Sequence, residues 1–340
     1  MKLIECIPNF SEGRNKNKIE EIIKEVEKTS GVFILDVHSG FSTNRTVLTM
    51  VGTPKGIEEA AFKLYRKASE LIDMRNHRGV HPRIGAIDVC PFIPIKNTKM
   101  EECIKIAKSL GEKVAEELKI PVYLYGKASS TKEREDLSTI RKFEYEGLKE
   151  RIHLPFWKPD FGEAKMDERK GATLIGARDL LIAFNINLNT KDKRIASEIA
   201  GKIRESGFMK VSNGRKVRVP GKLKGVRAIG WYIEELGCAQ VSSNLTDFKK
   251  TPLYLLFEEV KKEAEKLCVE VRGSELVGLI PEEALIESGK FYSKGRNSLR
   301  KKELIEIAIN CLGLSEKEKF EPNNKILEYK LKNINGYFNL

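Results

Sequence analysis

Two stretches of the chain show the same order of predicted elements, and this repeat constrains the possible fold more than any other feature. The first stretch reads strand, helix, strand, strand, helix, strand over residues 2–8, 15–29, 32–37, 45–51, 53–74 and 84–92. In its first helical segment, Ile19, Ile22 and Val26 share one face, as an amphipathic helix requires. Its second helix opens with Thr53-Pro54, a preferred N-cap followed by proline at the first helical position.

The second stretch repeats this order without repeating the letters. Its segments are a strand at 172–187, a helix capped by Thr190, strands at 226–233 and 239–244, a helix from Thr251-Pro252 to Leu267, and a strand at 269–272. The order βαββαβ is typical of a ferredoxin-like unit. The sequence therefore predicts an α/β (α+β) chain of two tandem ferredoxin-like subdomains.

Further segments extend the first subdomain and separate it from the second. A helix at 99–118, a short strand at 122–125 and a helical stretch at 137–149 follow the first repeat. Prolines and glycine then mark irregular chain near 155–172. We place the subdomains at 1–170 and 171–329, followed by a C-terminal tail at 330–340. Two similar units in one chain commonly leave a ligand crevice between them.

Composition excludes several classes of protein. No run of about 18 apolar residues is present, so the sequence predicts no membrane span. The six cysteines include no CxxC pair, which argues against a zinc site or a disulfide framework. With no signal-peptide pattern at the N-terminus, we expect a reduced, cytoplasmic protein. The net charge of +12 comes from 61 basic and 49 acidic residues. Such a surface suits an anionic partner or heat adaptation equally well.

The segment His77–Gly85 carries the strongest chemical signal. It holds two of the four histidines, and its Gly and Pro residues predict a loop beside the strand that follows. A histidine there can exchange protons near neutral pH, and the neighbouring arginines suit a substrate with carboxylates. His77 and His81 have the spacing of a helical metal pair, but Gly79 and Pro82 argue against a helix, so we predict no metal site. A purely structural hydrogen bond of His81 is the alternative.

Three other segments have sequence patterns that partly resemble binding sites. Gly171–Gly176 lacks the Lys-Ser/Thr pair of a phosphate loop, so no nucleotide site is predicted. The amides of Asn185 and Asn187 could bind a heterocycle such as a pterin, or simply cap a strand end. The segment 210–227 has seven basic residues and no acidic one, which indicates a flexible basic loop for a polyanionic ligand or RNA. It lacks aromatic residues for base stacking, and a solvated loop is the alternative.

The chain resembles a known family over residues 2 to 329. The matching segments are 5–13, 42–47, 71–75, 81–94, 121–126, 159–162, 176–178, 181–188, 230–232, 240–242, 244–245 and 273–281. In this order they are similar to the formiminotransferase domain of formimidoyltransferase-cyclodeaminases and to the stand-alone glutamate formimidoyltransferases. The resemblance implies two ferredoxin-like subdomains with a folate tunnel between them. It also implies transfer of the formimino group from formiminoglutamate to N5 of tetrahydrofolate, in histidine degradation, by a homodimer.

The resemblance also implies site residues. The family's catalytic histidine corresponds to His81, expected as general base and acid. Its folate-binding stretch corresponds to Gly162, Glu163, Ala164, Lys165, Met166, Asp167, Glu168, Arg169, Lys170 and Gly171. Further substrate-binding candidates, the arginines among them for carboxylates, are Asn9, Arg45, Arg83, Arg178 and Asn185. Tetrahydrofolate is the expected acceptor substrate, no metal is expected, and the basic segment 210–227 would attract polyglutamylated folates.

The sequence departs from the mammalian pattern in places. The stretch 162–171 is more charged, and His38 stands where mammalian sequences carry an acidic residue. A carboxylate that orients His81 would then have to be another one, such as Asp36 or Asp73. No cyclodeaminase domain follows the match, so we expect a separate cyclodeaminase. Formiminoglycine or N-formylglutamate is an alternative donor, and a non-catalytic RNA-binding ferredoxin-like protein is the alternative from another class.

Overall fold

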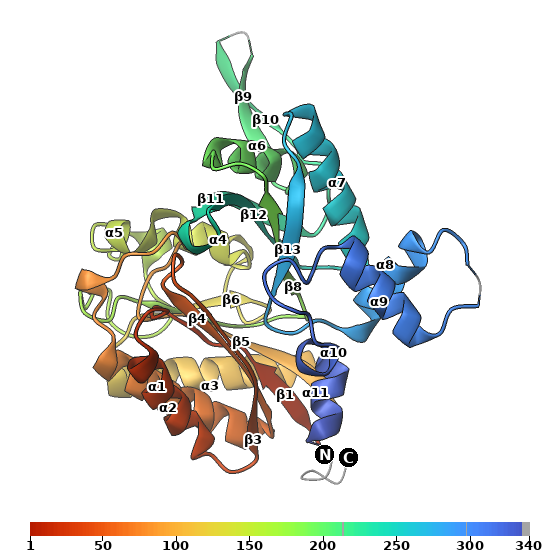
Figure 1. Ribbon diagram of the computed structural model, residues 1–340. Coiled ribbons are helices and arrows are strands. Elements are labelled where there is room, and N and C mark those ends of the chain that lie inside the picture. The colour runs from red at the N-terminus through yellow and green to blue at the C-terminus, as the bar shows by residue number, and fades with distance from the viewer. Residues whose placement is uncertain (213, 297, 335–340) are drawn as a thin grey trace. The chain divides into compact units, whose positions relative to one another are not determined.

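The computed structural model describes residues 1–212, 214–296 and 298–334. The chain divides into two compact units, one comprising Met1–Asp179 with Ile334 and the other Leu180–Asn333 (Figure 1). Each unit contains an antiparallel βαββαβ sheet, so the prediction of two tandem ferredoxin-like subdomains is confirmed. No helix of the described residues is long and apolar enough to cross a bilayer.

The first unit is built on a seven-stranded sheet. Its first strand is interrupted, because β1 (Leu3–Cys6) and β2 (Asn9–Phe10) both lie between β4 (Arg45–Gly52) and β5 (Ile87–Lys96). Strand β3 (Val32–Gly40) pairs with the other edge of β4. Across the sheet the strands follow one another as β5, β1 with β2, β4 and β3. Numbered by their place in the βαββαβ repeat this is the order 4-1-3-2, which is the arrangement of a ferredoxin-like sheet.

Three amphipathic helices cover one face of this sheet. They are α1 (Lys16–Glu27), α2 (Pro54–Leu71) and α3 (Met100–Leu118), and all three lie on the same side of the strands in Figure 1. Thr53 caps α2 by accepting a hydrogen bond from Gly56 N, with Pro54 at the first position, as the sequence predicts. Buried side chains such as Ile22, Leu64 and Phe92 form the core between helices and sheet.

Two parallel strands extend the sheet and move the predicted boundary. Strand β7 (Thr173–Ala177) lies between β5 and β6 (Val122–Gly126) and runs parallel to both. The predicted strand 172–187 is therefore two strands, β7 in the first unit and β8 (Ile182–Leu188) in the second. The apolar Leu180 and Leu181 join the two in the sequence and conceal the break. The units divide after Asp179 and not after residue 170.

The chain between β6 and β7 covers part of the other face of the same sheet. The predicted helix 137–149 is broken into α4 (Leu137–Ile140), a 3-10 turn at Arg141–Phe143, and α5 (Glu144–Leu148). The break comes at Glu144, whose φ is 52°. Ile140 and Leu148 pack in one cluster with Tyr123, Tyr125 and Val89 of the sheet. This packing places the 3-10 turn, and with it Arg141, against the sheet.

The second unit repeats the same topology in smaller form. Its four-stranded sheet has the order β11 (Val226–Ile233), β12 (Cys238–Leu245), β8, β13 (Val271–Val277), all antiparallel. Helices α6 (Lys193–Ile203) and α7 (Leu253–Lys266) contribute Ile199 and Leu256 to its core. Asp192, and not the predicted Thr190, is the N-cap of α6, since its side chain accepts from Arg194 N.

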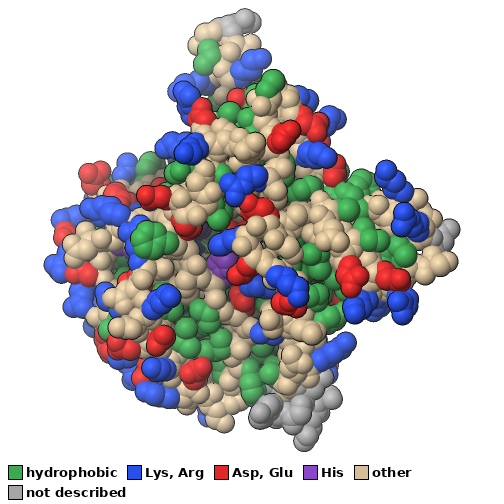
Figure 2. Space-filling model, in the orientation of Figure 1, with side chains coloured by type: hydrophobic (Ala, Val, Ile, Leu, Met, Phe, Trp, Pro, Cys, Tyr) green, Lys and Arg blue, Asp and Glu red, His purple; other side chains and the backbone are tan. Residues whose placement is uncertain are grey.

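The predicted basic loop contains a hairpin. Strands β9 (Phe208–Ser212) and β10 (Arg215–Val219) pair antiparallel and project from the second unit (Figure 1). Lys and Arg side chains line the hairpin on the face shown in Figure 2, whereas elsewhere on that face both signs of charge are interspersed. The prediction of a flexible loop was incomplete here. Valines alternate with basic residues within 215–219, which is the two-residue period of a strand.

The C-terminal part of the second unit adds helices beyond the predicted repeat. They are α8 (Glu282–Tyr292), α9 (Lys301–Cys311), α10 (Pro322–Lys325) and α11 (Leu327–Asn333). Leu285 of α8 and Ile305 of α9 join the core of the unit, as does Ile326 between α10 and α11. The predicted tail 330–340 therefore begins inside α11, and its residues 335–340 lie outside the described residues.

Candidate functional site

His81 lies in an irregular loop of the first unit, as the sequence predicts. Gly79 holds this loop close to the β3–β4 turn, because a Cβ there would lie 2.2 Å from the Thr43 carbonyl oxygen. The His81 imidazole is half-buried, and its Nδ1 is 2.7 Å from the Pro82 carbonyl oxygen. A carbonyl only accepts hydrogen bonds, so Nδ1 carries the proton and the lone pair of neutral His81 is on Nε2.

A buried carboxylate and two arginines lie beside this loop. Asp88 on β5 is fully buried, and its Oδ2 accepts from Arg45 Nη1 at 2.7 Å and from Arg141 Nη1 at 2.6 Å. Its Oδ1 accepts from Ile84 N at 3.0 Å. This hydrogen bond ties the end of the loop His77–Gly85, which we call the histidine loop, to β5. Asn9 joins the group by accepting from Arg45 Nε at 3.2 Å. We call Asp88, Arg45 and Arg141 the arginine–aspartate cluster.

The charges of this cluster act on His81. Burial lowers the pKa of His81 well below its usual value, the positive charges of Arg45 and Arg141 lower it further, and Asp88 opposes them. Burial alone would raise the pKa of Asp88, but Arg141 and Arg45 outweigh it and bring the pKa down to about 2. At neutral pH the site therefore holds one carboxylate, two guanidinium groups and a neutral imidazole.

Two of the predicted arginines lie apart from this cluster. Arg83 donates to both oxygens of Glu146 at 2.7 Å and to His77 Nδ1 at 3.1 Å. His77 Nε2 in turn lies 2.8 Å from the Asn44 carbonyl oxygen, so His77 is neutral and structural. Arg83 thus anchors the loop to α5 through these hydrogen bonds. Arg178 follows β7, and its backbone N–H donates to the Phe92 carbonyl oxygen at 3.1 Å.

The charge of Arg178 acts on two buried polar side chains, Glu5 and Tyr125, that the sequence did not single out as site residues. Glu5 is buried at 2% exposure, and its Oε2 makes no hydrogen bond to the described residues. Burial raises the pKa of Glu5 to about 7, and Arg178 opposes the rise. Burial likewise raises the pKa of Tyr125 to about 12, with Arg178 and Arg141 opposing it. A charged residue within the apolar Leu3–Ile7 run was the signal that could have identified Glu5.

The family-implied folate stretch meets the histidine loop only at its end. Ala86 N donates to the Lys170 carbonyl oxygen at 2.8 Å, and Gly171 pairs with Gly85. The first half of the stretch borders a cavity of about 650 Å³ beside the end of α3. That cavity is lined by Glu112, Ala115, Glu116, Lys119, Pro121, Phe161, Gly162, Glu163, Lys165, Met166 and Asp167. Neither His81 nor the arginine–aspartate cluster lines it.

Asn185 lies in the second unit, in the middle strand pair of its sheet. It is opposite Ser242 on β12 and Glu275 on β13, and Asn187 two residues later donates to Glu316 at 2.8 Å. Gln240 joins this row by donating to Asn187 at 2.7 Å and accepting from Trp231 at 2.7 Å. The strand therefore presents amides on the face opposite its core, and Asn187 is already bonded.

The carboxylate that acts on His81 is Asp88, which sequence reasoning did not select. Of the two residues named for that role, Asp73 is held by Arg75, whose Nη2 lies 2.6 Å from Asp73 Oδ2. The missed signal was an aspartate at the start of the apolar run 84–95. Among the described residues, no three His, Cys, Asp or Glu side chains form a group that could hold a metal ion.

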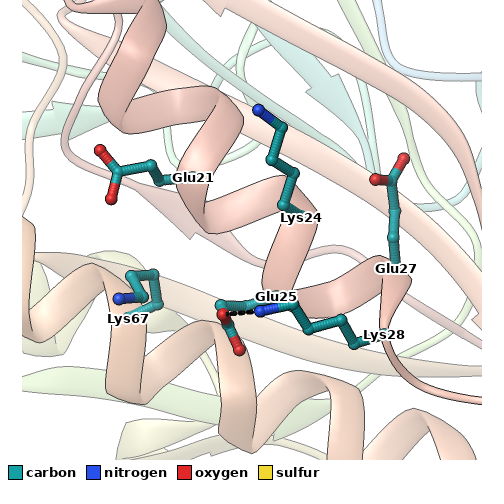
Figure 3. Close-up of a pocket in the computed structure, with 6 residues that line it drawn as sticks. All are labelled: Glu21, Lys24, Glu25, Glu27, Lys28 and Lys67. Carbon is teal, nitrogen blue, oxygen red and sulfur yellow. Dashed lines mark hydrogen bonds and ion pairs between the residues drawn. The ribbon is translucent and has the colours of Figure 1, made fainter.

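A second cavity, of about 450 Å³, lies on the surface between α1 and α2 (Figure 3). Its lining consists of long charged side chains, Glu21, Lys24, Glu25, Glu27, Lys28 and Lys67. The Glu25–Lys28 ion pair spans consecutive turns at the end of α1, and the pair sits in the groove shown. Such a groove is a solvated helix face with no apolar wall, and it carries no functional assignment.

Comparison with known proteins follows the division into units. The family model described as "Formiminotransferase domain, N-terminal subdomain" matches residues 3–178, and the model "Formiminotransferase domain" matches residues 183–332. Both matches end or begin within a few residues of the break between Asp179 and Leu180.

Curated relatives agree with these models. The formimidoyltransferase-cyclodeaminase of Mus musculus is 47% identical over 331 residues, which are 96% of this chain and 60% of the mouse protein. The glutamate formimidoyltransferase of Streptococcus pyogenes serotype M1 is 42% identical over 90% of this chain and 98% of its own length. That of Thermoplasma acidophilum is 44% identical over 86% and 92%. With two family models covering nearly its whole length, the chain belongs to the formiminotransferase family.

Proposed function

We propose that this protein transfers the formimino group of N-formimino-L-glutamate to N5 of tetrahydrofolate, releasing L-glutamate. The observation that carries the proposal is His81, a neutral imidazole fixed at Nδ1 and placed beside two arginines that suit an anionic substrate. Family membership and the two stand-alone relatives named glutamate formimidoyltransferase support it.

His81 would carry one proton through the reaction. Nε2 accepts the proton that N5 loses as N5 bonds to the amidine carbon, and a tetrahedral intermediate forms. The same nitrogen then protonates the glutamate nitrogen as its bond to that carbon breaks. The proton count closes, because the proton leaving N5 ends on the leaving amine. Such a base and acid typically contributes about 10²–10⁴-fold to the rate.

The arginine–aspartate cluster would bind and orient the donor. Two guanidinium groups share one oxygen of Asp88, so the cluster has an excess of one positive charge, two arginines against one carboxylate. A carboxylate of formiminoglutamate would neutralise that excess. Orientation of two bound substrates is commonly worth more than the proton transfer itself. Arg178, with Glu5 and Tyr125 beside it, is a second place on the first unit for polar substrate groups.

For the acceptor, the main candidates are the stretch 162–171 and Asn185. The stretch joins the histidine loop through the Lys170–Ala86 hydrogen bond, which supports a role in placing the folate near that loop. The basic hairpin β9–β10, with Lys210, Arg215, Lys216 and Arg218, suits a polyglutamate tail. We further infer that the protein acts as a cytoplasmic homodimer, as its family membership suggests.

The test is an absorbance assay with three donors in parallel that reads 5-formiminotetrahydrofolate from the two formimino donors and 5-formyltetrahydrofolate from N-formylglutamate. Formiminoglutamate, formiminoglycine and N-formylglutamate are each supplied with tetrahydrofolate and purified protein. The proposal expects product from formiminoglutamate at a kcat/KM about tenfold or more above the other two, because only formiminoglutamate combines the amidine with the full dicarboxylate. Product from formiminoglycine or N-formylglutamate alone would move the activity to that donor, and no product from any donor would contradict the proposal.

A further inference from the structure

The cluster beside His81 contains more positive than negative charge before any substrate arrives. Arg45 and Arg141 both donate to Oδ2 of Asp88, at 2.7 and 2.6 Å, while Oδ1 is occupied by the Ile84 amide at 3.0 Å. One carboxylate thus serves two guanidinium groups and a backbone N–H. Arg45 is 6% exposed, so its charge is screened little by water.

The same geometry opposes protonation of His81. The groups whose charges bear on the imidazole are Arg45 from β4, Arg141 from the 3-10 turn and Asp88 from β5, together with the Pro82 carbonyl at Nδ1. Two positive charges and one negative charge disfavour a third positive charge at the ring. A base that must hold a proton during catalysis is therefore poorly supported in the empty site.

We propose that a substrate carboxylate bound at Arg45 and Arg141 turns His81 into an effective base, so that donor binding and proton uptake by the imidazole are coupled. Arg141, which no sequence motif indicated, is then a positioning and specificity residue for an anionic donor. The inference rests on the proposed function for the identity of the donor, but its physical content is the coupling between an anion and the imidazole.

The coupling follows from the charges. A bound carboxylate brings the total of two arginines, Asp88 and the ligand to zero, which removes the repulsion that an imidazolium would meet. Because linkage is reciprocal, protonated His81 binds the carboxylate more tightly by the same factor as the carboxylate favours protonation. A donor without a carboxylate at this place would meet a weak proton acceptor, so the cluster selects the donor through rate as well as affinity.

The experiment follows the His81 side chain by NMR in histidine-labelled protein. The four histidines give few resonances, and His81→Gln assigns the relevant one. The His81 pKa is measured alone and with saturating L-glutamate, with binding confirmed by shifts of other resonances. The proposal expects a pKa below the ordinary value in the free protein and a rise of about one unit or more with glutamate. A His81 pKa that stays constant while glutamate binds, or an absence of glutamate binding, would overturn it.

Two variants assign the effect to Arg141. Arg141→Gln should raise the His81 pKa without ligand and reduce the glutamate-induced rise, while Arg141→Lys should preserve most of it. Lys142→Gln removes the same charge from the exposed neighbouring residue and should leave both values unchanged. Equal behaviour of Arg141→Gln and Lys142→Gln would contradict the assignment. A coupled pKa in a protein that transfers no formimino group would refute the proposed function alone, and transfer without coupling would refute this inference alone.

Discussion

Both units bury a carboxylate among several cations, but only the cluster of the first unit acts on His81, the residue that we propose as the catalytic base. In the first unit Asp88 accepts from Arg45 and Arg141. In the second, Glu263 on α7 lies 2.5 Å from Lys222, 2.5 Å from Lys266 and 3.3 Å from Lys202. Burial opposes ionisation of both, and in both the cations outweigh it and lower the pKa to about 2.

The difference lies in the partners. The lysines around Glu263 are partly in water, with side chains 27% to 52% exposed, and Lys202 also pairs with Glu198 at 2.8 Å. The arginines of Asp88 are 7% and 16% exposed, and their charges reach the His81 imidazole. Planar guanidinium groups hold a fixed geometry that flexible lysines do not. A low carboxylate pKa therefore does not mark a functional site unless a group that can accept and donate a proton, such as an imidazole, lies beside it.

The largest difference between the clusters should appear in stability. Asp88→Asn removes the counterion of two buried arginines and should lower the free energy of unfolding by about 3–5 kcal/mol. Glu263→Gln leaves lysines that can turn into water, so we expect about 1–2 kcal/mol after allowance for their exposure. Urea unfolding of both variants at neutral pH measures this. Equal losses would show that burial of the cations does not distinguish the clusters.

Acid should act on both clusters alike. Each carboxylate has a folded pKa of about 2, below its ordinary value of 3.8 for Asp88 and 4.5 for Glu263. Their contributions to stability are thus complete above pH 4.5 and are lost as the pH falls toward 2. In acid the difference in unfolding free energy between each variant and the parent should accordingly shrink.

Catalytic activity should also distinguish the two clusters. The expected difference in activation free energy is smaller than the difference in stability. Asp88→Asn should lower kcat/KM for formimino transfer by about tenfold or more, because the arginines lose the anchor that orients them. Glu263→Gln should stay within about twofold of the parent, since its lysine partners lie outside the hairpin β9–β10 and outside the stretch 162–171. Both are assayed at a temperature where circular dichroism shows them folded. A comparable loss in Glu263→Gln would place its cluster in the functional machinery.

Glu5 extends the comparison to a buried carboxyl without a full set of partners. Its pKa is raised to about 7 by burial, opposite to Asp88 and Glu263. As the pH rises from 4.5 to 7 the unfolded chain ionises Glu5 while the folded chain keeps it protonated, so stability falls over that window. Glu5→Gln should therefore stabilise the protein by about 3 kcal/mol at pH 8 and by nothing at pH 4. A variant that destabilises equally at both pH values would contradict the raised pKa.

The smallest expected effect is a shift in the pH profile. Because the pKa of His81 is well below its ordinary value in the free protein, the acidic limb of kcat/KM should lie below pH 6.5. The acidic limb of kcat, which reports the substrate complex, should lie at higher pH if a bound carboxylate favours the imidazolium. Coincident limbs, or a kcat/KM limb at or above pH 6.5, would argue against the electrostatic description of the site.

Sequence reasoning predicted the repeat because it depends on local periodicity. Helices 16–27, 54–71 and 253–266 and the strands around them followed from apolar spacing and from Thr-Pro starts. It missed the division at 179/180, because Leu180 and Leu181 continue the apolar run across a break that only pairing of β7 with β5 and β6 defines. Helices α8 to α11 lay beyond the repeat that guided the reading.

The residues of the candidate site likewise fall into those that the sequence indicates and those that only the fold brings together. His81 is visible from sequence because a loop histidine flanked by Gly, Pro and Arg is unusual. Arg45 and Asn9 were also candidates, and the structure brings them to one place. Asp88 and Arg141 were not, because their association joins β5 to a turn that is 53 residues away in the chain. Arg83 stays a predicted carboxylate-binding residue, but nothing local in the sequence shows that its guanidinium is bonded to Glu146 and His77.

Turnover of His81→Gln with formiminoglutamate and tetrahydrofolate, compared with the parent and with His153→Gln, tests the role of His81 in the reaction. His153 is exposed, so its variant controls for loss of a histidine as such. We expect a fall in kcat of about 10²–10⁴-fold in His81→Gln, with folate affinity retained and His153→Gln at the parent rate. A His81→Gln protein that turns over at the parent rate would contradict the role of His81 and, with it, the proposed mechanism.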